Sequence, residues 1–522
     1  MFMKKLDGQK GNLIKAVLLI WLAVQIGFIA WYNFALAKYN IDYDSAKLYV
    51  HALEICRNHS FIIDGWKYIT TAEWDCSLLF AVPFYYLTGD IYVSFAMSNM
   101  VFIALWIWTV FRLFSGRGHG TECALLTLDL LFIPYGLGML EYFNMLFFNG
   151  GQYVVKALCP LMLVAFLNPG RGKDTKSKKW VSCGYAAICA ALLFLTTVSS
   201  GIYVFVSALV PILAVNLYEQ LKKDSRVSRR DLVIAAAVTG IVLAGYVCGR
   251  ILNIDAHGSE MILNTGVSGV FENITGCFFG IFGLFSAIAD SPVRVLSYEG
   301  ICIVMRIAFV LILIGSALYG LWRVLHNKAE LWEKLLLSCF VWNTFVLCVC
   351  HTVNSEGVCH YRYHLIGVLP LLCLMTNYLV NAYKTSVKRM RIVWAVLGFS
   401  IAGINVFSAN RTVFLWRWEY TDLEMLCEYA RTEKIEIVYI YGHEDFAEDC
   451  RLLDYKNTET VYMPVDDSGH TWVKDYYEEW DGRQITFENT VLVIDEATED
   501  TIEMFGHTYQ RIAQLGYLGV YQ

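Results

Sequence analysis

Long apolar runs alternate with short polar segments over most of the chain. A helix that crosses a bilayer needs about 20 apolar residues, and about eleven runs approach that length. They cover residues 13–37, 91–114, 122–141, 151–168, 180–198, 201–219, 231–252, 300–322, 332–351, 364–383 and 391–410. The composition agrees, with 57% hydrophobic and 17% charged residues, whereas soluble domains have about 25% charged. The pattern predicts an α-helical polytopic membrane protein with about eleven transmembrane helices.

Basic residues gather in every second loop between these runs. The first group, Lys4 to Lys15, precedes the first run, and later groups follow the second, fourth, sixth, eighth and tenth runs. Basic loops stay in the cytoplasm. We therefore expect a multi-pass protein of the cell membrane with a cytoplasmic N-terminus. The remaining loops and the C-terminal segment are expected outside.

Two of the expected outside loops contain apolar runs that are short. In the long acidic loop 38–90, residues 74–87 are apolar. In the loop 253–299, the run Phe278 to Phe285 is aromatic and interrupted by glycines. Runs of this length are more typical of interfacial or re-entrant segments than of spans.

The C-terminal segment has a different pattern. Helical spacing over 422–434 and 444–453 alternates with strand-like runs at 435–442, 460–463 and 490–494. Such alternation favours a partly parallel sheet. We expect a transmembrane domain over 1–410, which includes the loop 38–90, and a small extracytoplasmic α/β domain over 411–522.

Acidic residues directly follow the first apolar run. The spacing predicts a short helix from Asp42 to about Arg57, in which Asp44 shares a stripe with Leu48, His51 and Ile55. A carboxylate on an apolar stripe is costly unless it is paired or used. One interpretation is that Asp42 and Asp44 only cap an interfacial helix. The other is that one of them does chemistry.

Further ionisable residues lie at the expected outer edge of the membrane. Arginine binds phosphate through a planar fork, so a phosphate with an apolar chain below it would suit His360-Tyr361-Arg362-Tyr363-His364. The alternative is an aromatic anchor at headgroup level. The other candidates near the outer edge are Lys47, Glu141, Lys156, Arg250 and Arg306.

A metal site has weaker support. Asp42-Tyr43-Asp44 is a D-x-D sequence, which His51, His257 or Glu260 could complete with ligands typical of divalent cations. Nothing in the spacing requires a metal.

Two short motifs and the topology resemble the C-type (GT-C fold) glycosyltransferases, in particular the branch of bacterial protein O-mannosyltransferases and aminoarabinose transferases. Asp44-Ser45-Ala46-Lys47-Leu48-Tyr49 stands where that branch has Asp-Glu at the start of the first outside helix. Ser45 replaces the usual Glu. Tyr361-Arg362-Tyr363 with Pro370 resembles the R-Y…P stretch of these proteins.

The resemblance implies a membrane enzyme that moves a sugar from a polyprenyl-phosphate donor to a glycan, lipid or protein acceptor outside the cytoplasm. Asp44 would be the base of an inverting displacement, with Asp42 as a cap or second acid. Arg362, with Arg306, Arg250 and Lys156, would bind the donor phosphate. No cofactor is required, a divalent metal stays open, and no nucleic-acid partner is expected.

Three other functions are compatible with this topology. A flippase or transporter of lipid-linked saccharides often shows internal repeats, and none is visible. A ligase or polymerase of lipid-linked saccharides would usually carry its largest outside loop late in the chain. A sensor protein would depend on its outside domain alone.

Overall fold

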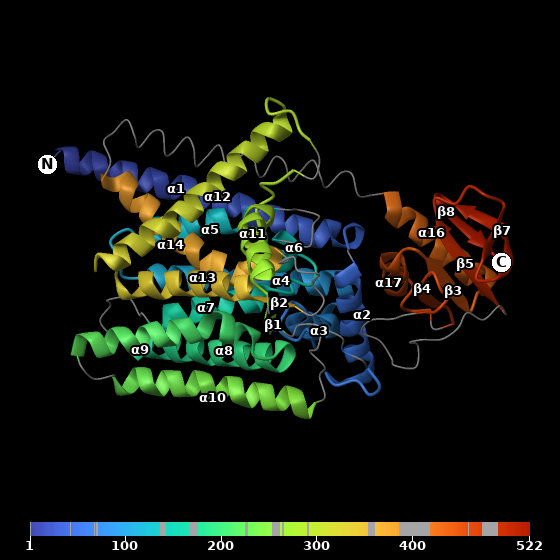
Figure 1. Ribbon diagram of the computed structural model, residues 1–522, viewed down its shortest axis with the longest axis horizontal. Helices are drawn as coiled ribbons and strands as arrows, with labels where there is room; N and C mark the ends of the chain where they lie inside the picture. Colours follow the sequence, from blue (N-terminus) through green and yellow to red (C-terminus); the bar gives the residue numbers. More distant parts are fainter. Residues whose placement is uncertain are drawn as a thin grey trace. The chain divides into compact units, whose positions relative to one another are not determined.

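The computed structural model describes most of the chain (Figure 1). The described residues are 2–41, 43–66, 68, 71–135, 142–167, 176–224, 228–252, 261–263, 266–289, 292–352, 361–385, 418–457, 459–471 and 489–522. They form two compact units. Unit 1 contains Met1–Tyr32, Thr70–Ser77 and Asn99–Arg411, and unit 2 contains Asn33–Ile69, Leu78–Ser98 and Thr412–Gln522.

Unit 1 is a helical bundle. Its helices are α1 (Phe2–Trp31), the larger part of α4 (Ile91–Phe114), α5 (Gly120–Leu131), α6 (Phe143–Phe147), α7 (Val154–Leu167), α8 (Lys176–Ser200), α9 (Val210–Asp224), α10 (Arg229–Ile251), α11 (Val267–Leu284), α12 (Tyr298–Leu325), α13 (Leu331–Val349) and α14 (Leu365–Thr385). Helix α14 packs against α5, α7, α12 and α13. Its residues from Leu365 to Met375 are all buried, as expected for a helix that is apolar on every side.

Eight helices within the described ranges are long and apolar enough to cross a membrane. They are α1, α4, α8 and α10 to α14, and each except α11 overlaps a predicted run. The multi-pass helical prediction is confirmed, whereas the count of about eleven is not. The run 391–410 lies outside the described residues.

Three predicted runs form shorter helices. Run 122–141 gives α5, which has 12 residues and ends before Pro134. Proline restricts the residue before it to extended conformations, so a helix usually ends there. Run 151–168 gives α7 with 14 residues, and run 201–219 is divided between the π-helical turn η3 (Phe205–Leu209) and α9.

The aromatic run Phe278 to Phe285 differs from its prediction. Instead of a segment broken by glycine, it forms the end of α11, a continuous helix of 18 residues. A glycine inside a helix costs roughly 1 kcal/mol relative to alanine. Here two glycines allow close packing against a neighbouring segment, described below, which the sequence pattern did not reveal.

Unit 2 joins parts of the chain that are far apart in sequence. It contains α2 (Tyr43–Asn58), α3 (Leu78–Thr88), α16 (Trp418–Glu433) and α17 (Glu444–Leu453). Helix α2 confirms the helix predicted from Asp42 to about Arg57, and α3 lies in the apolar run 74–87. The predicted division at residues 410 and 411 stays a prediction, because the compact units group residues by packing rather than by order.

The C-terminal part of unit 2 contains a six-stranded sheet. Its strands are β3 (Ile437–Tyr441), β4 (Val461–Val465), β5 (Thr490–Asp495), β6 (Thr501–Met504), β7 (His507–Leu515) and β8 (Leu518–Tyr521), in the order β4-β3-β5-β8-β7-β6. Strand β3 is parallel to β4 and β5, and the other pairs are antiparallel. This confirms the predicted partly parallel sheet. Helices α16 and α17 cover one face, where Leu426, Ala447 and Val493 belong to a single apolar core.

Candidate active site

Asp44 lies in the first turn of α2, where a carboxylate is favoured by the helix dipole. Its Oδ1 atom is 3.8 Å from Nζ of Lys47, one turn along the helix. The Asp44 side chain keeps 22% of its surface exposed, whereas that of Lys47 keeps 6%. The acid is therefore accessible and is oriented by a buried cation. Asp42 lies outside the described residues.

Helix α2 is held on several sides within unit 2. Tyr49 stacks on Phe95 of α4 with ring centroids 3.9 Å apart, and His51 stacks on Trp66 at 5.2 Å. Cys56 Sγ donates to the carbonyl of Val82 in α3, at 3.9 Å. Every residue of α2 from Ser45 to Cys56 is buried. A catalytic side chain on such a helix has a fixed position, as precise chemistry requires.

His51 is buried among aromatic rings. Its Nε2 atom has no hydrogen-bond partner within the part of the chain that the structure describes. Burial, followed by the nearby charge of Lys47, lowers the pKa of His51 to about 3. At neutral pH this side chain is therefore an uncharged packing residue. Its geometry favours a structural role over proton transfer.

Arg362 lies in unit 1, in the 3-10 turn η5 (Tyr361–His364) that leads into α14. The backbone of this turn is fixed from two sides. The carbonyl of Tyr363 accepts hydrogen bonds from Nδ2 of Asn343 at 3.2 Å and from the hydroxyl of Tyr203 at 3.5 Å. The ring of Tyr363 meets the rings of Tyr153 and Tyr203 edge to face, each with centroids 6.0 Å apart. We call Tyr153, Tyr203 and Tyr363 the tyrosine cluster.

Helix α11 supports the same turn through its two glycines. A Cβ atom on Gly283 would lie 2.5 Å from the ring of Tyr361, and one on Gly280 would lie 2.7 Å from Nε2 of His364. Both distances are too short for any larger side chain without movement of the neighbour. His364 is buried in this contact, so the structure gives it a packing role beside Arg362.

Lys156 forms a buried ion pair. Its Nζ atom is 3.3 Å from Oδ2 of Asp75, and the two side chains keep 7% and 0% of their surface exposed. Ser200 donates to the same Oδ2 at 3.1 Å, and Lys156 also donates to the carbonyl of Gln152 at 2.9 Å. The charge of Lys156 is thus matched inside unit 1. Its predicted role as a phosphate ligand stays a prediction.

The buried pair and Arg362 both lie beside the tyrosine cluster. Nζ of Lys156 lies 5.0 Å from the ring centre of Tyr153. Cζ of Arg362 lies 5.9 Å from the ring centre of Tyr363, which contacts the ring of Tyr153 edge to face. Unit 1 therefore brings two of the four predicted cations to the tyrosine cluster. A guanidinium beside several phenols can bind an oxyanion through charge and hydrogen bonds.

The other predicted residues have different surroundings or lie outside the described residues. Arg306 donates to the carbonyl of Ser286 at 3.1 Å. Arg250 is exposed near the end of α10, where its Nε donates to the hydroxyl of Tyr246 at 3.3 Å. Glu141 and His360 belong to segments that the structure does not describe.

No metal-binding group of three or more His, Cys, Asp or Glu side chains occurs among the described residues. Of the ligands considered for a D-x-D site, Asp42, His257 and Glu260 fall outside those residues. The divalent metal therefore stays an open prediction.

The sequence interpretation missed the pairing of Asp75 with Lys156 and the roles of Tyr153, Tyr203 and Ser200. A signal was present, because Asp75 and Lys156 are opposite charges inside two apolar runs. Ionisable residues in such runs usually find a partner. The two residues are 81 positions apart, so the sequence does not indicate that they are partners of each other.

Comparison with known proteins gives one result. No protein-family model and no curated protein matches the sequence. Solved structures of ArnT from Cupriavidus metallidurans do match in three dimensions. The apo structure has a TM-score of 0.55 at 12% identity, with 97% of each chain covered. The structure bound to undecaprenyl phosphate has the same TM-score at 10% identity, with 97% of this chain and 98% of that chain covered.

The chain has the ArnT fold. ArnT is an aminoarabinose transferase with the GT-C fold, so the expected resemblance is confirmed at the level of fold. The similarity extends over nearly the whole chain and therefore includes both the helical bundle and the C-terminal sheet region. The protein is therefore a multi-pass membrane protein with the ArnT fold.

Proposed function

We propose that this protein is a membrane glycosyltransferase that moves a sugar from a polyprenyl-phosphate donor to an acceptor on the extracytoplasmic face. The observation that carries the proposal is the ArnT fold, which extends over nearly the whole length of the chain. ArnT itself has been solved with undecaprenyl phosphate bound. Arg362 beside the tyrosine cluster adds a group suited to a lipid phosphate.

The proposed chemistry is a single inverting displacement. Asp44 accepts the proton of the acceptor hydroxyl while its oxygen forms a bond to the anomeric carbon of the donor sugar. The bond from that carbon to the phosphate oxygen breaks, and polyprenyl phosphate leaves as an anion. Arg362 stabilises the negative charge that develops on the phosphate. The step needs one carboxylate base and no nucleotide, because the donor enters from the membrane.

The decisive experiment uses the purified full-length protein with candidate polyprenyl-phosphate sugars and a range of glycan, lipid and protein acceptors. Release of free polyprenyl phosphate, together with a glycosylated product of inverted anomeric configuration, is the expected result. Movement of the intact lipid-linked sugar across a vesicle membrane without release of lipid phosphate would instead identify a flippase. Retention of configuration would exclude the single displacement.

A binding measurement tests the role of Arg362. Arg362→Ala should weaken the binding of undecaprenyl phosphate by about 10-fold or more, because a hydrogen bond to a charged group contributes roughly 1.5–3 kcal/mol. Arg230→Ala is the matched control, since it removes an exposed arginine of the same unit that is not among the predicted phosphate ligands. Binding by Arg362→Ala as tight as that by Arg230→Ala and by the unaltered protein would remove Arg362 from the donor site.

A further inference from the structure

Glu54 is a buried carboxylate on α2, ten residues after Asp44. Its Oε1 atom accepts a hydrogen bond from the hydroxyl of Tyr455 at 3.0 Å and lies 3.6 Å from Nη1 of Arg57. Its Oε2 atom accepts from Nδ2 of Asn58 at 3.2 Å. A buried carboxylate without such partners would cost several kcal/mol. Arg57 and Asn58 belong to α2 itself, whereas Tyr455 comes from the C-terminal part of unit 2.

The contact between Glu54 and Tyr455 is part of a larger junction within unit 2. Helix α17 packs against α2 (Figure 1). Tyr455 follows the end of α17 by two residues. Burial, together with the nearby carboxylate of Glu54, raises the pKa of the Tyr455 phenol. At neutral pH the hydroxyl therefore keeps its proton and donates a hydrogen bond to Glu54.

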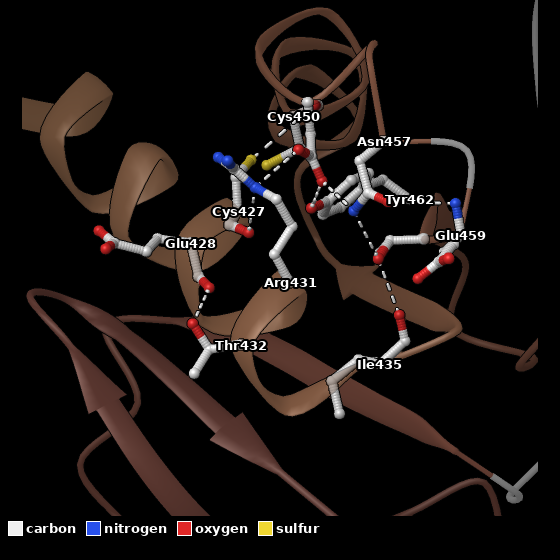
Figure 2. A network of polar contacts seen from close by, with 11 residues as sticks. Cys427, Glu428, Arg431, Thr432, Ile435, Cys450, Asn457, Glu459 and Tyr462 are labelled. Carbon is white, nitrogen blue, oxygen red and sulfur yellow. Dashed lines mark hydrogen bonds and ion pairs between the residues drawn. The ribbon is translucent and has the colours of Figure 1, made fainter.

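The turn that carries Tyr455 is held rigidly by its neighbour Asp454. Oδ2 of Asp454 accepts hydrogen bonds from the hydroxyl of Tyr462 at 2.7 Å and from Nδ2 of Asn457 at 2.9 Å. Oδ1 of Asp454 forms an ion pair with Nε of Arg431 at 2.9 Å. Figure 2 shows the three partners, of which Arg431 belongs to α16, Asn457 to the turn and Tyr462 to the strand β4.

The consequence is that Tyr455 has little freedom of its own. The buried Asp454 ties the turn to both a helix and a strand of the C-terminal domain, so the position of the Tyr455 hydroxyl is set by that domain as a whole. A hydrogen bond from such a fixed donor can hold its acceptor in one place. A second link, between Lys38 and Glu424 at 3.0 Å, is exposed and is expected to contribute little.

We propose that Tyr455 is a positioning residue for sugar transfer, through which the C-terminal domain holds Glu54 and thereby orients α2 and Asp44. The inference rests on the proposed function of Asp44 and extends it, because it assigns a task in transfer to a domain that has no role in the proposed chemical step. Displacement of a base by about 1 Å can lower a rate by two orders of magnitude. By holding α2 in place, the C-terminal domain is therefore expected to raise the rate constant of the chemical step.

The test compares Tyr455→Phe with Tyr441→Phe in the full-length protein. Each substitution removes one phenolic hydroxyl from the same domain, but the Tyr441 hydroxyl donates to Asp467 at 2.8 Å on an exposed surface. Tyr455→Phe should lower kcat about 2- to 10-fold, the range expected for one hydrogen bond, with the KM for the lipid donor unchanged. Tyr441→Phe should change neither. A loss of the same size in both variants, or a change in KM alone, would overturn the proposal.

A second measurement does not depend on activity. Amide hydrogen exchange of the peptide covering 43–58 should be faster in Tyr455→Phe than in Tyr441→Phe or the unaltered protein, because the restraint on α2 is released. Unchanged exchange in Tyr455→Phe would overturn the positioning role. If the unaltered protein transfers no sugar but Tyr455→Phe still loosens α2, the proposed function fails while the mechanical coupling stands.

Discussion

Two aspartate–lysine pairs in this molecule differ in the burial of their carboxylates. Asp44 and Lys47 lie one turn apart on α2, with 3.8 Å between their charged atoms and the carboxylate partly exposed. Asp75 and Lys156 come from distant parts of the sequence, lie 3.3 Å apart and are buried. The Asp44 side chain keeps 22% of its surface exposed, whereas that of Asp75 keeps 0%.

The difference indicates that a buried carboxylate stabilises the fold, whereas a partly exposed one is better suited to a reaction. Ser200 and Lys156 both contact Oδ2 of Asp75, and the lysine is further restrained by the carbonyl of Gln152. An ion pair of this kind fixes the segment around Asp75 to α7 and α8. The local pair on α2 contributes little to the fold, since i,i+3 pairs are worth a few tenths of a kcal/mol. The Asp44 carboxylate therefore matters more for the proposed chemistry than for the stability of the fold.

The largest expected effect is on catalysis. Asp44→Asn keeps the shape of the side chain and removes its basicity, so we expect transfer to fall by about 100- to 10,000-fold, the usual contribution of a general base. The thermal unfolding midpoint should change little. Asp42→Asn, tested in parallel with the same lipid-linked donor, should retain most of the activity. Full activity in Asp44→Asn would exclude Asp44 as the base.

The second effect is on stability. Lys156→Met leaves Asp75 buried without its cation, which should lower the free energy of unfolding by about 3–5 kcal/mol. The double variant Asp75→Asn/Lys156→Met should recover part of this loss, because it removes both charges. Lys38→Met is the control, since its exposed partner Glu424 should make the loss smaller than about 1 kcal/mol. Thermal unfolding in detergent measures all three, and similar losses for Lys156→Met and Lys38→Met would contradict the comparison.

A third prediction concerns the stability of the folded protein at acidic pH. His51 has a pKa near 3 in the folded protein against 6.5 when it is free, so the uncharged ring favours the folded state. Its contribution is complete above about pH 6.5 and is lost as the pH falls towards 3, with a loss of about 2 kcal/mol at pH 5. His51→Phe keeps a ring on Trp66 and should be less sensitive to acid.

The measurement for His51 is the difference between unfolding midpoints at pH 7.5 and pH 5. The unaltered protein should lose more stability over this interval than His51→Phe. His59→Phe serves as the control, because it replaces an exposed histidine of the same unit with the same side chain. An identical pH dependence in His51→Phe and the unaltered protein would show that His51 does not cause it.

The smallest effect is expected from a glycine. Gly283→Ala brings a methyl group against the ring of Tyr361, so the turn that carries Arg362 must shift, at a cost of about 1 kcal/mol. Binding of undecaprenyl phosphate should weaken at the same time. Gly184→Ala is the matched control on α8, where a Cβ atom meets nothing within 4 Å, so helix propensity should make it stabilising. Stabilisation by both substitutions would show that α11 does not support the turn.

The candidate site was only partly accessible from the sequence. Helix α2, with Asp44 in its first turn, followed from local spacing, and Arg362 followed from a short motif. The partners of Arg362 did not, because Tyr153 and Tyr203 lie far from it along the chain and their aromatic side chains look like ordinary bundle residues. The glycines of α11 were interpreted as helix breakers, since their contacts with Tyr361 and His364 are not visible in a local pattern.

Features that depend on neighbouring residues could be predicted from the sequence. These are the apolar helices, the helix after the first span, and the alternating helices and strands of the C-terminal sheet, because periodicity is a local property. The pairing of charges, in contrast, depends on the tertiary structure. It buried Asp75 with Lys156, left Asp44 accessible, and brought Tyr455 to Glu54 across 401 residues. The burial of a carboxylate and the identity of its partners depend on the packing of segments that are far apart in sequence. These two properties distinguish a carboxylate that can react from one that stabilises the fold.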